Sequence, residues 1–169
     1  MSVMNKPFYI HNAKSINLSY TDILQSVNSA NVFMPYYKAE NERDFYLNFI
    51  LGLVNNKEIT LIDIDSHTDE VQNLIGLPDL LEATENVFNK FDDVNALIKG
   101  VHSSQAKITL FTSGTTGQPK KITHSVEHFI QTARISDNHA EDRWAFAYNP
   151  THMAGLRFSF RHFSIKISW

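Results

Sequence analysis

The sequence contains no cysteine, and this absence excludes disulfide bonds, thiolate metal sites and cysteine nucleophiles. It also lacks a long apolar run, because its most hydrophobic stretch, 45–54, is about half the roughly 20 residues that span a bilayer. The first residues contain no apolar signal segment. No internal repeat or low-complexity linker interrupts the 169 residues. We therefore expect one compact cytoplasmic domain with no membrane span.

An excess of charge of either sign is also missing. The formal net charge is −3 at pH 7, which gives no general attraction to nucleic acid or to an anionic membrane. The hydrophobic share of 43% and the charged share of 20% are ordinary for a soluble globular protein. We therefore expect no nucleic-acid partner.

Two kinds of hydrophobic pattern alternate along the chain. Apolar residues recur at helical spacing in 20–27, 42–54, 71–75, 87–100 and 126–133. Short β-branched or aromatic runs, typical of strands, occupy 8–10, 58–64, 107–111 and 144–148. This order predicts an α/β fold, with a mainly parallel sheet flanked by helices.

A loop rich in glycine and hydroxyl groups follows the strand predicted at 107–111. Its residues 112–120 read Thr-Ser-Gly-Thr-Thr-Gly-Gln-Pro-Lys. The two glycines let the backbone approach a phosphate and point N–H groups at it, while the hydroxyls donate hydrogen bonds. Lys120 adds a mobile positive charge, and Pro119 stiffens the chain before it. The spacing differs from that of the common P-loop, in which lysine directly follows the second glycine.

The string 112–120 resembles the phosphate-binding signature of the acyl-adenylate-forming superfamily, which includes the acyl-CoA synthetases. Nine specified positions would coincide by chance about once in 10¹⁰ trials. The resemblance implies that the chain is an incomplete N-terminal part of the family's large domain. It also implies ATP with Mg²⁺, a carboxylic acid and coenzyme A as the ligands of the full-length family, whose magnesium-binding residues come later in the chain. The loop residues that would grip the β- and γ-phosphates are Thr112, Ser113, Gly114, Thr115, Thr116, Gly117 and Lys120. Lys121 departs from the family, which usually has glycine there.

A second segment of the family is matched downstream. Residues 149–155 read Asn-Pro-Thr-His-Met-Ala-Gly, which looks like the family's segment in which a histidine lies three residues before a glycine. By this resemblance His152 would line the acyl pocket. A histidine at the start of a helix is the alternative interpretation.

Two other patterns suggest metals. His124 and His128 fit the H-x-x-E-H pattern of an inverted zinc peptidase, which would place both on one face of a helix. We favour a different interpretation, in which Ser125 caps the helix and His124 belongs to a Thr-His pair that often follows the adenylating loop. Asp63, Asp65 and Asp69 resemble a calcium loop only loosely, because the required glycine is missing.

The last residues, 157–169, contain three basic side chains and no acidic one. Their apolar residues alternate with polar ones, which predicts a strand, whereas the family continues here with a helix. We therefore divide the chain into a partial AMP-binding domain, 1–156, and an atypical tail, 157–169. An out-of-frame continuation is our preferred explanation of the tail, and a basic edge strand is the other.

Two functional classes follow from the resemblance. The chain is either part of an acyl-CoA ligase that is inactive alone, or a non-catalytic remnant that binds a nucleotide or a partner.

Overall fold

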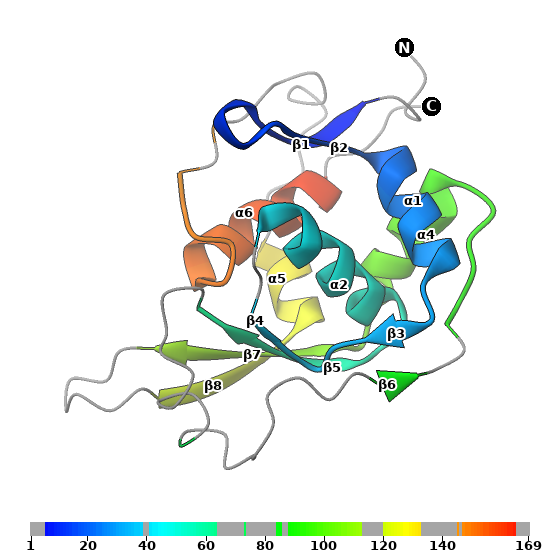
Figure 1. The fold of residues 1–169 in the computed structure, drawn as a ribbon. Helices are drawn as coiled ribbons and strands as arrows, with labels where there is room; N and C mark the ends of the chain where they lie inside the picture. Colours follow the sequence, from blue (N-terminus) through cyan, green and yellow to red (C-terminus); the bar gives the residue numbers. More distant parts are fainter. Residues whose placement is uncertain are drawn as a thin grey trace.

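The computed structural model describes residues 6–38, 41–63, 73, 84–85, 88–112, 120–132, 145 and 147–164. Within them, strands and helices form where most of the sequence patterns predicted them, and strands that were not predicted form at 16–19, 32–33, 36–38, 84–85 and 120–125 (Figure 1). The strands are β1 Pro7–His11, β2 Ile16–Ser19, β3 Val32–Phe33, β4 Tyr36–Lys38, β5 Glu58–Ile62, β6 Thr84–Glu85, β7 Lys107–Thr112 and β8 Lys120–Ser125. The helices are the 3-10 turn η2 Asn12–Lys14 and the α-helices α1 Tyr20–Ser29, α2 Glu42–Val54, α4 Val94–His102, α5 Val126–Thr132 and α6 Met153–Ser164.

The central sheet has the strand order β4-β5-β7-β8. β4 and β5 are parallel, β5 and β7 are parallel, and β7 pairs with β8 in the antiparallel sense. The predicted α/β class is therefore confirmed, with a sheet that is mixed rather than purely parallel. Two small antiparallel pairs, β1-β2 and β3-β6, lie outside this sheet.

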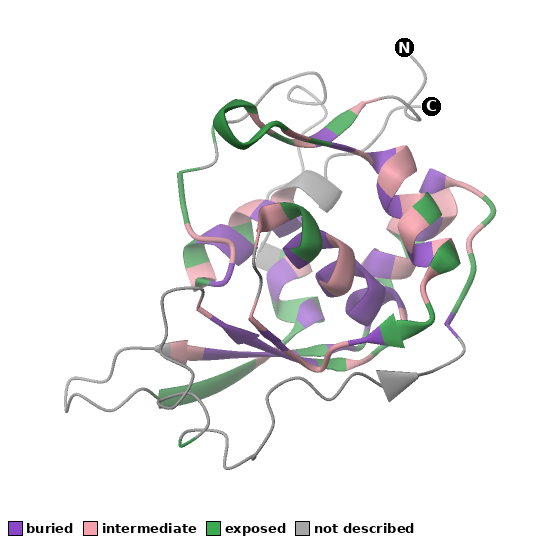
Figure 2. Cartoon of the chain, in the orientation of Figure 1, coloured by how far each residue is buried: buried purple, intermediate pink, exposed green. Residues whose placement is uncertain are grey.

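The α-helices lie together on one side of the central sheet in Figure 1, and Figure 2 shows buried residues concentrated between the two layers. The core joins the inner faces of α1, α2 and α4 to β5 and β7. Its fully buried members include Ile23, Phe45, Phe49, Ile59 and Ile108. Among the described residues, no helix is both long and apolar enough to cross a membrane.

Helix α2 and strand β5 approach each other very closely at Gly52. A Cβ atom on Gly52 would lie 2.5 Å from the Cδ1 atom of Ile59, well inside normal contact distance. Asn41 caps the start of α2 by accepting a hydrogen bond from the backbone N–H of Asp44, and Asn56, with φ of 53°, follows its end. Residues that favour the start and the end of a helix therefore flank α2.

The N-terminal helix α1 is also capped. Ser19 and Asp22 form a reciprocal capping box, in which the Ser19 hydroxyl accepts from the Asp22 N–H and the Asp22 carboxylate accepts from the Ser19 N–H at 2.8 Å. The hydroxyl of Ser19 also donates to the same carboxylate at 2.7 Å. These hydrogen bonds lower the pKa of the Asp22 carboxyl.

Two predicted elements differ from the structure. The helix expected at 87–100 begins only at Val94, because Asp93, with extended backbone, caps it by accepting a hydrogen bond from the N–H of Ala96. The strand expected at 144–148 does not form at the described positions Ala145, Ala147 and Tyr148. The helix expected at 71–75 falls almost entirely outside the described residues.

The prediction of a strand after Leu156 is wrong. Helix α6 continues to Ser164, because Leu156 and Phe160, four residues apart, form a buried helical face. Phe160 stacks on Phe129 of α5 with ring centroids 5.0 Å apart. The hydroxyls of Tyr46 and Ser159 lie 3.2 Å apart, which ties α6 to α2. The alternating pattern of residues 157–164 therefore belongs to an amphipathic helix.

Candidate functional site

The two ends of the signature loop are held together by strand pairing. Thr112 is the last residue of β7 and Lys120 the first of β8, and they are paired at the end of a six-pair antiparallel register. The backbone of Thr112 and the side chain of Lys120 are described. The other predicted phosphate-binding residues, Ser113, Gly114, Thr115, Thr116 and Gly117, lie outside the described residues.

The loop begins at the carboxyl end of the parallel strands. β5 and β7 run parallel with Thr60 beside Thr109, so Asp63, which follows β5, and Thr112, the last residue of β7, both lie toward the carboxyl ends of these strands. Ligands of open α/β sheets bind in the crevice outside the carboxyl ends of the strands. The two ends of the signature loop thus lie where such a fold places its ligand site.

His152 lies against the end of β5. Its Nε2 atom contacts the Oδ2 atom of Asp63, the residue that directly follows the strand. The second carboxylate oxygen of Asp63 accepts a hydrogen bond of 3.1 Å from the side-chain amide of Asn149. Asp63 therefore binds the turn 149–152 through two of its side chains and holds it at the carboxyl edge of the sheet.

Asn149 organises this turn from within. Its side-chain oxygen accepts hydrogen bonds from the backbone N–H of Thr151 at 3.0 Å and from the Thr151 hydroxyl at 2.7 Å. Its backbone carbonyl accepts from the N–H of His152 at 3.1 Å. These bonds fix the backbone that carries His152.

The glycine three residues after His152 has a steric explanation. A Cβ atom on Gly155 would lie 2.2 Å from the carbonyl oxygen of Asn149. The atoms that it would meet belong to the backbone of Asn149 and Pro150, which cannot move aside as a flexible side chain can. The first turn of α6 packs directly on the turn that precedes it for this reason. The packing of α6 on this turn therefore requires glycine at position 155.

The structure thus brings His152 and the described ends of the signature loop to the same edge of the sheet. Sequence reasoning missed Asp63 as the residue that contacts both Asn149 and His152, because it considered Asp63 only as a member of a loosely calcium-like acidic cluster. The available signal was an acidic residue at the carboxyl end of a buried strand, where functional side chains of α/β sheets gather.

Lys121 and its neighbours on β8 face solvent. Lys121 is paired with Phe111 and is exposed. The hydroxyls of Thr109 and Thr123 are hydrogen-bonded across the two strands at 2.8 Å. This cross-strand bond supports the register that leads into the signature loop.

The histidines of the H-x-x-E-H pattern lie on different elements. His124 is on β8 and His128 on α5, and their rings are stacked with centroids 5.8 Å apart. The hydroxyl of Ser125 accepts a hydrogen bond from the N–H of His128 at 3.4 Å, as the predicted helix cap requires. No group of three or more histidine and acidic side chains that could hold a metal occurs among the described residues. The single-helix arrangement expected of a zinc peptidase is therefore absent from this part of the chain.

The environment of His124 favours its neutral form. Burial lowers the pKa of His124, and the nearby charges of His128 and Arg157 lower it further.

Of the three aspartates that loosely resemble a calcium loop, Asp63 contacts Asn149 and His152, while Asp65 and Asp69 lie outside the described residues.

Comparison with known proteins gives one informative similarity. The chain is 29% identical over 144 residues to a 2-succinylbenzoate–CoA ligase from Enterococcus faecalis. The chain resembles a CoA ligase. The match covers 70% of this chain but only 29% of that ligase, so the chain spans less than a third of its relative's length. No protein-family model matches the chain, and no solved structure matches it.

Proposed function

We propose that this chain is the phosphate-binding part of an ATP-dependent acyl-CoA ligase. The observation that carries the proposal is the signature 112–120, whose ends leave paired strands at the carboxyl edge of the sheet. The similarity to a CoA ligase supports the same class of reaction. In that reaction a carboxylate oxygen attacks the α-phosphorus of ATP, which forms an acyl-adenylate and releases pyrophosphate. A thiol such as that of coenzyme A then displaces AMP to give a thioester.

The residues of the signature would hold the leaving pyrophosphate. Backbone N–H groups around Gly114 and Gly117, with the neighbouring hydroxyls, would donate to the β- and γ-phosphates, and Lys120 would supply a positive charge. Mg²⁺ would accompany ATP, and no residue of this chain is assigned to it. His152, held by Asp63, would border the site of the acyl group.

We expect the chain alone to bind Mg-ATP weakly and to catalyse no turnover. Adenylation requires charge stabilisation by several groups that act together, and the assigned residues supply only phosphate contacts and one pocket wall. A remnant that binds a nucleotide or a partner without catalysis is the second candidate. It shares the phosphate contacts and differs in having no acyl substrate.

Thermal unfolding with increasing Mg-ATP tests the proposal. Binding to the folded state raises the melting temperature, by an amount that grows with ligand concentration relative to the dissociation constant. The Lys120→Ala variant should lose most of this rise, whereas Lys121→Ala, which removes an adjacent exposed lysine, should keep it. The absence of any rise at about 10 mM Mg-ATP would contradict phosphate binding by the chain.

ATP–pyrophosphate exchange separates the two candidates. A complete acyl-CoA ligase serves as the positive control for the assay. Exchange that depends on an added carboxylic acid would show adenylation and would refute the expectation of no turnover. Binding without exchange by the chain, restored when a polypeptide with the remaining part of such a ligase is added, would favour the ligase part over the remnant.

A further inference from the structure

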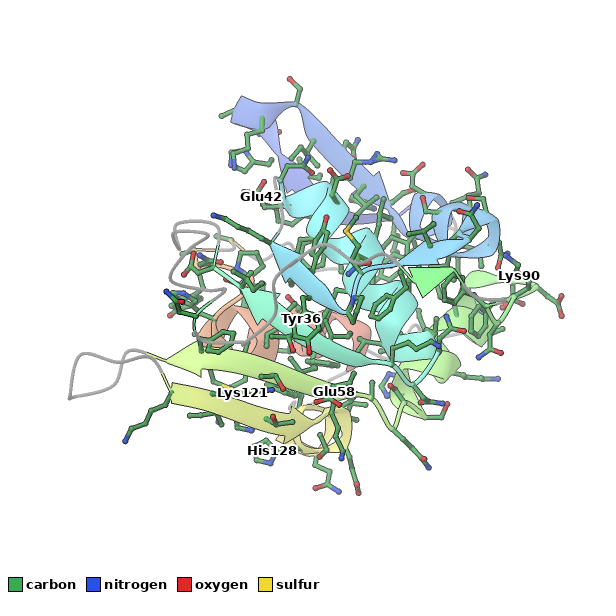
Figure 3. The ribbon with its side chains drawn as sticks, turned by 60° about the horizontal axis from the view of Figure 1, so that its bottom comes forward. Tyr36, Glu42, Glu58, Lys90, Lys121 and His128 are labelled. Atoms are coloured by element: carbon green, nitrogen blue, oxygen red, sulfur yellow. The ribbon has the colours of Figure 1, made fainter. Side chains whose placement is uncertain are left out.

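Strand β8 is exposed to solvent along most of its length. It is six residues long, it is paired with β7 along its whole length, and it is the last strand of the central sheet as described. Five of its residues are exposed, and the sixth, His124, is half-buried. In Figure 3 the strand forms the outer margin of the sheet, with Lys121 and His128 along it. An edge strand of this kind presents a row of backbone donors and acceptors on its outer side.

An apolar residue in the middle of β8 is left largely uncovered. Ile122 is 39% exposed, although its cross-strand partner Leu110 is buried in the core. Both lie on the side of the sheet that the helices cover. The helical layer therefore stops short of β8, and a further strand beside β8 would bury Ile122 against the margin of the core.

The surroundings of β8 are basic. The cationic or titratable groups on it and around it, here called the basic margin, are Lys120, Lys121 and His124 of the strand, His128 of α5 and Arg157 of α6. Among the described residues of β8 and α5, Glu127 is the one acidic group, and its carboxylate accepts a hydrogen bond of 2.8 Å from the Gln131 amide. Such a margin attracts an acidic partner and repels a basic one.

From this combination we infer that β8 binds an extended acidic segment of a partner protein, which adds as a strand to the edge of the sheet. Backbone hydrogen bonds to the outer side of β8 provide the attachment, an apolar side chain of the segment covers Ile122, and carboxylates face the basic margin. A second copy of the chain is disfavoured, because pairing of two β8 strands would place one basic margin against another. Lys120 is common to this inference and to the proposed function, but the backbone of β8, Lys121 and Ile122, on which the inference rests, have no part in the proposed nucleotide binding.

Two synthetic peptides provide the test. Both are about eight residues long and alternate valine with a charged residue, glutamate in one and lysine in the other. The glutamate peptide should bind with a dissociation constant below about 1 mM at low salt, and the lysine peptide at least about tenfold more weakly. Binding of the glutamate peptide should weaken as the ionic strength rises, and it should slow hydrogen exchange at the amides of 120–125.

Matched variants locate the binding. Ile122→Asp and Lys121→Glu should each weaken binding of the glutamate peptide by about tenfold or more. Ile10→Asp is the control, because Ile10 is an exposed isoleucine (44%) on a strand far from β8 (Figure 1). Circular dichroism establishes that each variant is folded before binding is measured. Equal binding of both peptides, protection of amides elsewhere than in β8, or no binding to the folded wild-type chain would each overturn the inference. A peptide-free dimer that protects the same amides would overturn it in favour of a second copy.

Discussion

Asp63 and Asn149 are 86 positions apart in the sequence and are joined by a 3.1 Å hydrogen bond at the carboxyl end of β5. Because Asp63 also contacts His152, one carboxylate holds both ends of the turn 149–152. We expect Asp63→Ala to release this turn and to lower the free energy of unfolding by about 1–2 kcal/mol, as hydrogen bonds to a charged group require. Urea denaturation measures the change. Asp92→Ala, at an exposed aspartate, is the control and should change stability by less than about 0.5 kcal/mol. An equal effect of both substitutions would mean that the contacts of Asp63 add nothing to stability.

Replacement of Gly155 should be much more damaging than replacement of another helical glycine. In Gly155→Ala the new Cβ would lie 2.2 Å from a backbone carbonyl, whereas in Gly100→Ala it would lie 2.8 Å from the ring of Phe91. A side-chain ring can move aside more easily than backbone. We expect Gly155→Ala to cost about 3 kcal/mol, and Gly100→Ala distinctly less. Urea denaturation of the two variants makes the comparison, and a similar loss in both would show that α6 does not depend on this close approach.

The position of α6 in the core predicts a large effect of truncating Phe160. This side chain is fully buried against Phe129, so Phe160→Ala should lower stability by about 3–5 kcal/mol. Phe158→Ala removes the same ring at a partly buried site of the same helix and should cost less. Thermal or urea unfolding measures both. If neither substitution changed stability, residues 157–164 would contribute nothing to the fold, as an out-of-frame tail would.

The depressed pKa of His124 predicts a loss of stability in acid. Because the folded-state pKa lies below the unfolded value of 6.5, protonation favours the unfolded chain. The contribution of His124 is therefore complete above about pH 6.5 and is lost as the pH falls through the folded-state pKa. His124→Gln should reduce the difference between urea midpoints measured at about pH 7.5 and about pH 5.5. His128→Gln should reduce this difference in urea midpoints by less, because it removes one of the charges near His124 while His124 itself stays partly buried. An unchanged difference in His124→Gln would assign the acid sensitivity to other groups.

Local signals in the sequence predicted β5 and β7, the two inner strands of the central sheet, and the first two α-helices, but not the outer strands β4 and β8. Helices α1 and α2 have capping residues directly before them, and β5 is a run of β-branched and apolar residues. Such signals act within a few residues, so one chain is enough to read them. The register that brings the two ends of the signature loop together was not predicted, since it depends on the pairing of β7 with β8.

The errors arose where a distant contact decides the structure. Residues 157–164 alternate like a strand, but the core offers a place for Leu156 and Phe160 on one helical face, and burial of that face outweighs the local pattern. The contact of Asp63 with His152 spans 89 positions, and a sequence without aligned relatives contains no trace of such a pair. The candidate site was therefore found by its motif, and its support from β5 became visible only in three dimensions.

The pairing of Thr112 with Lys120 has a consequence for the energetics of the signature loop. Six strand pairs bring together the ends of the segment 113–119 during folding, so the entropy of loop closure is lost before any ligand arrives. Because closure entropy grows slowly with length, doubling this loop would cost the fold only about 0.6 kcal/mol. The stability of the strands that carry the loop therefore constrains its length only weakly.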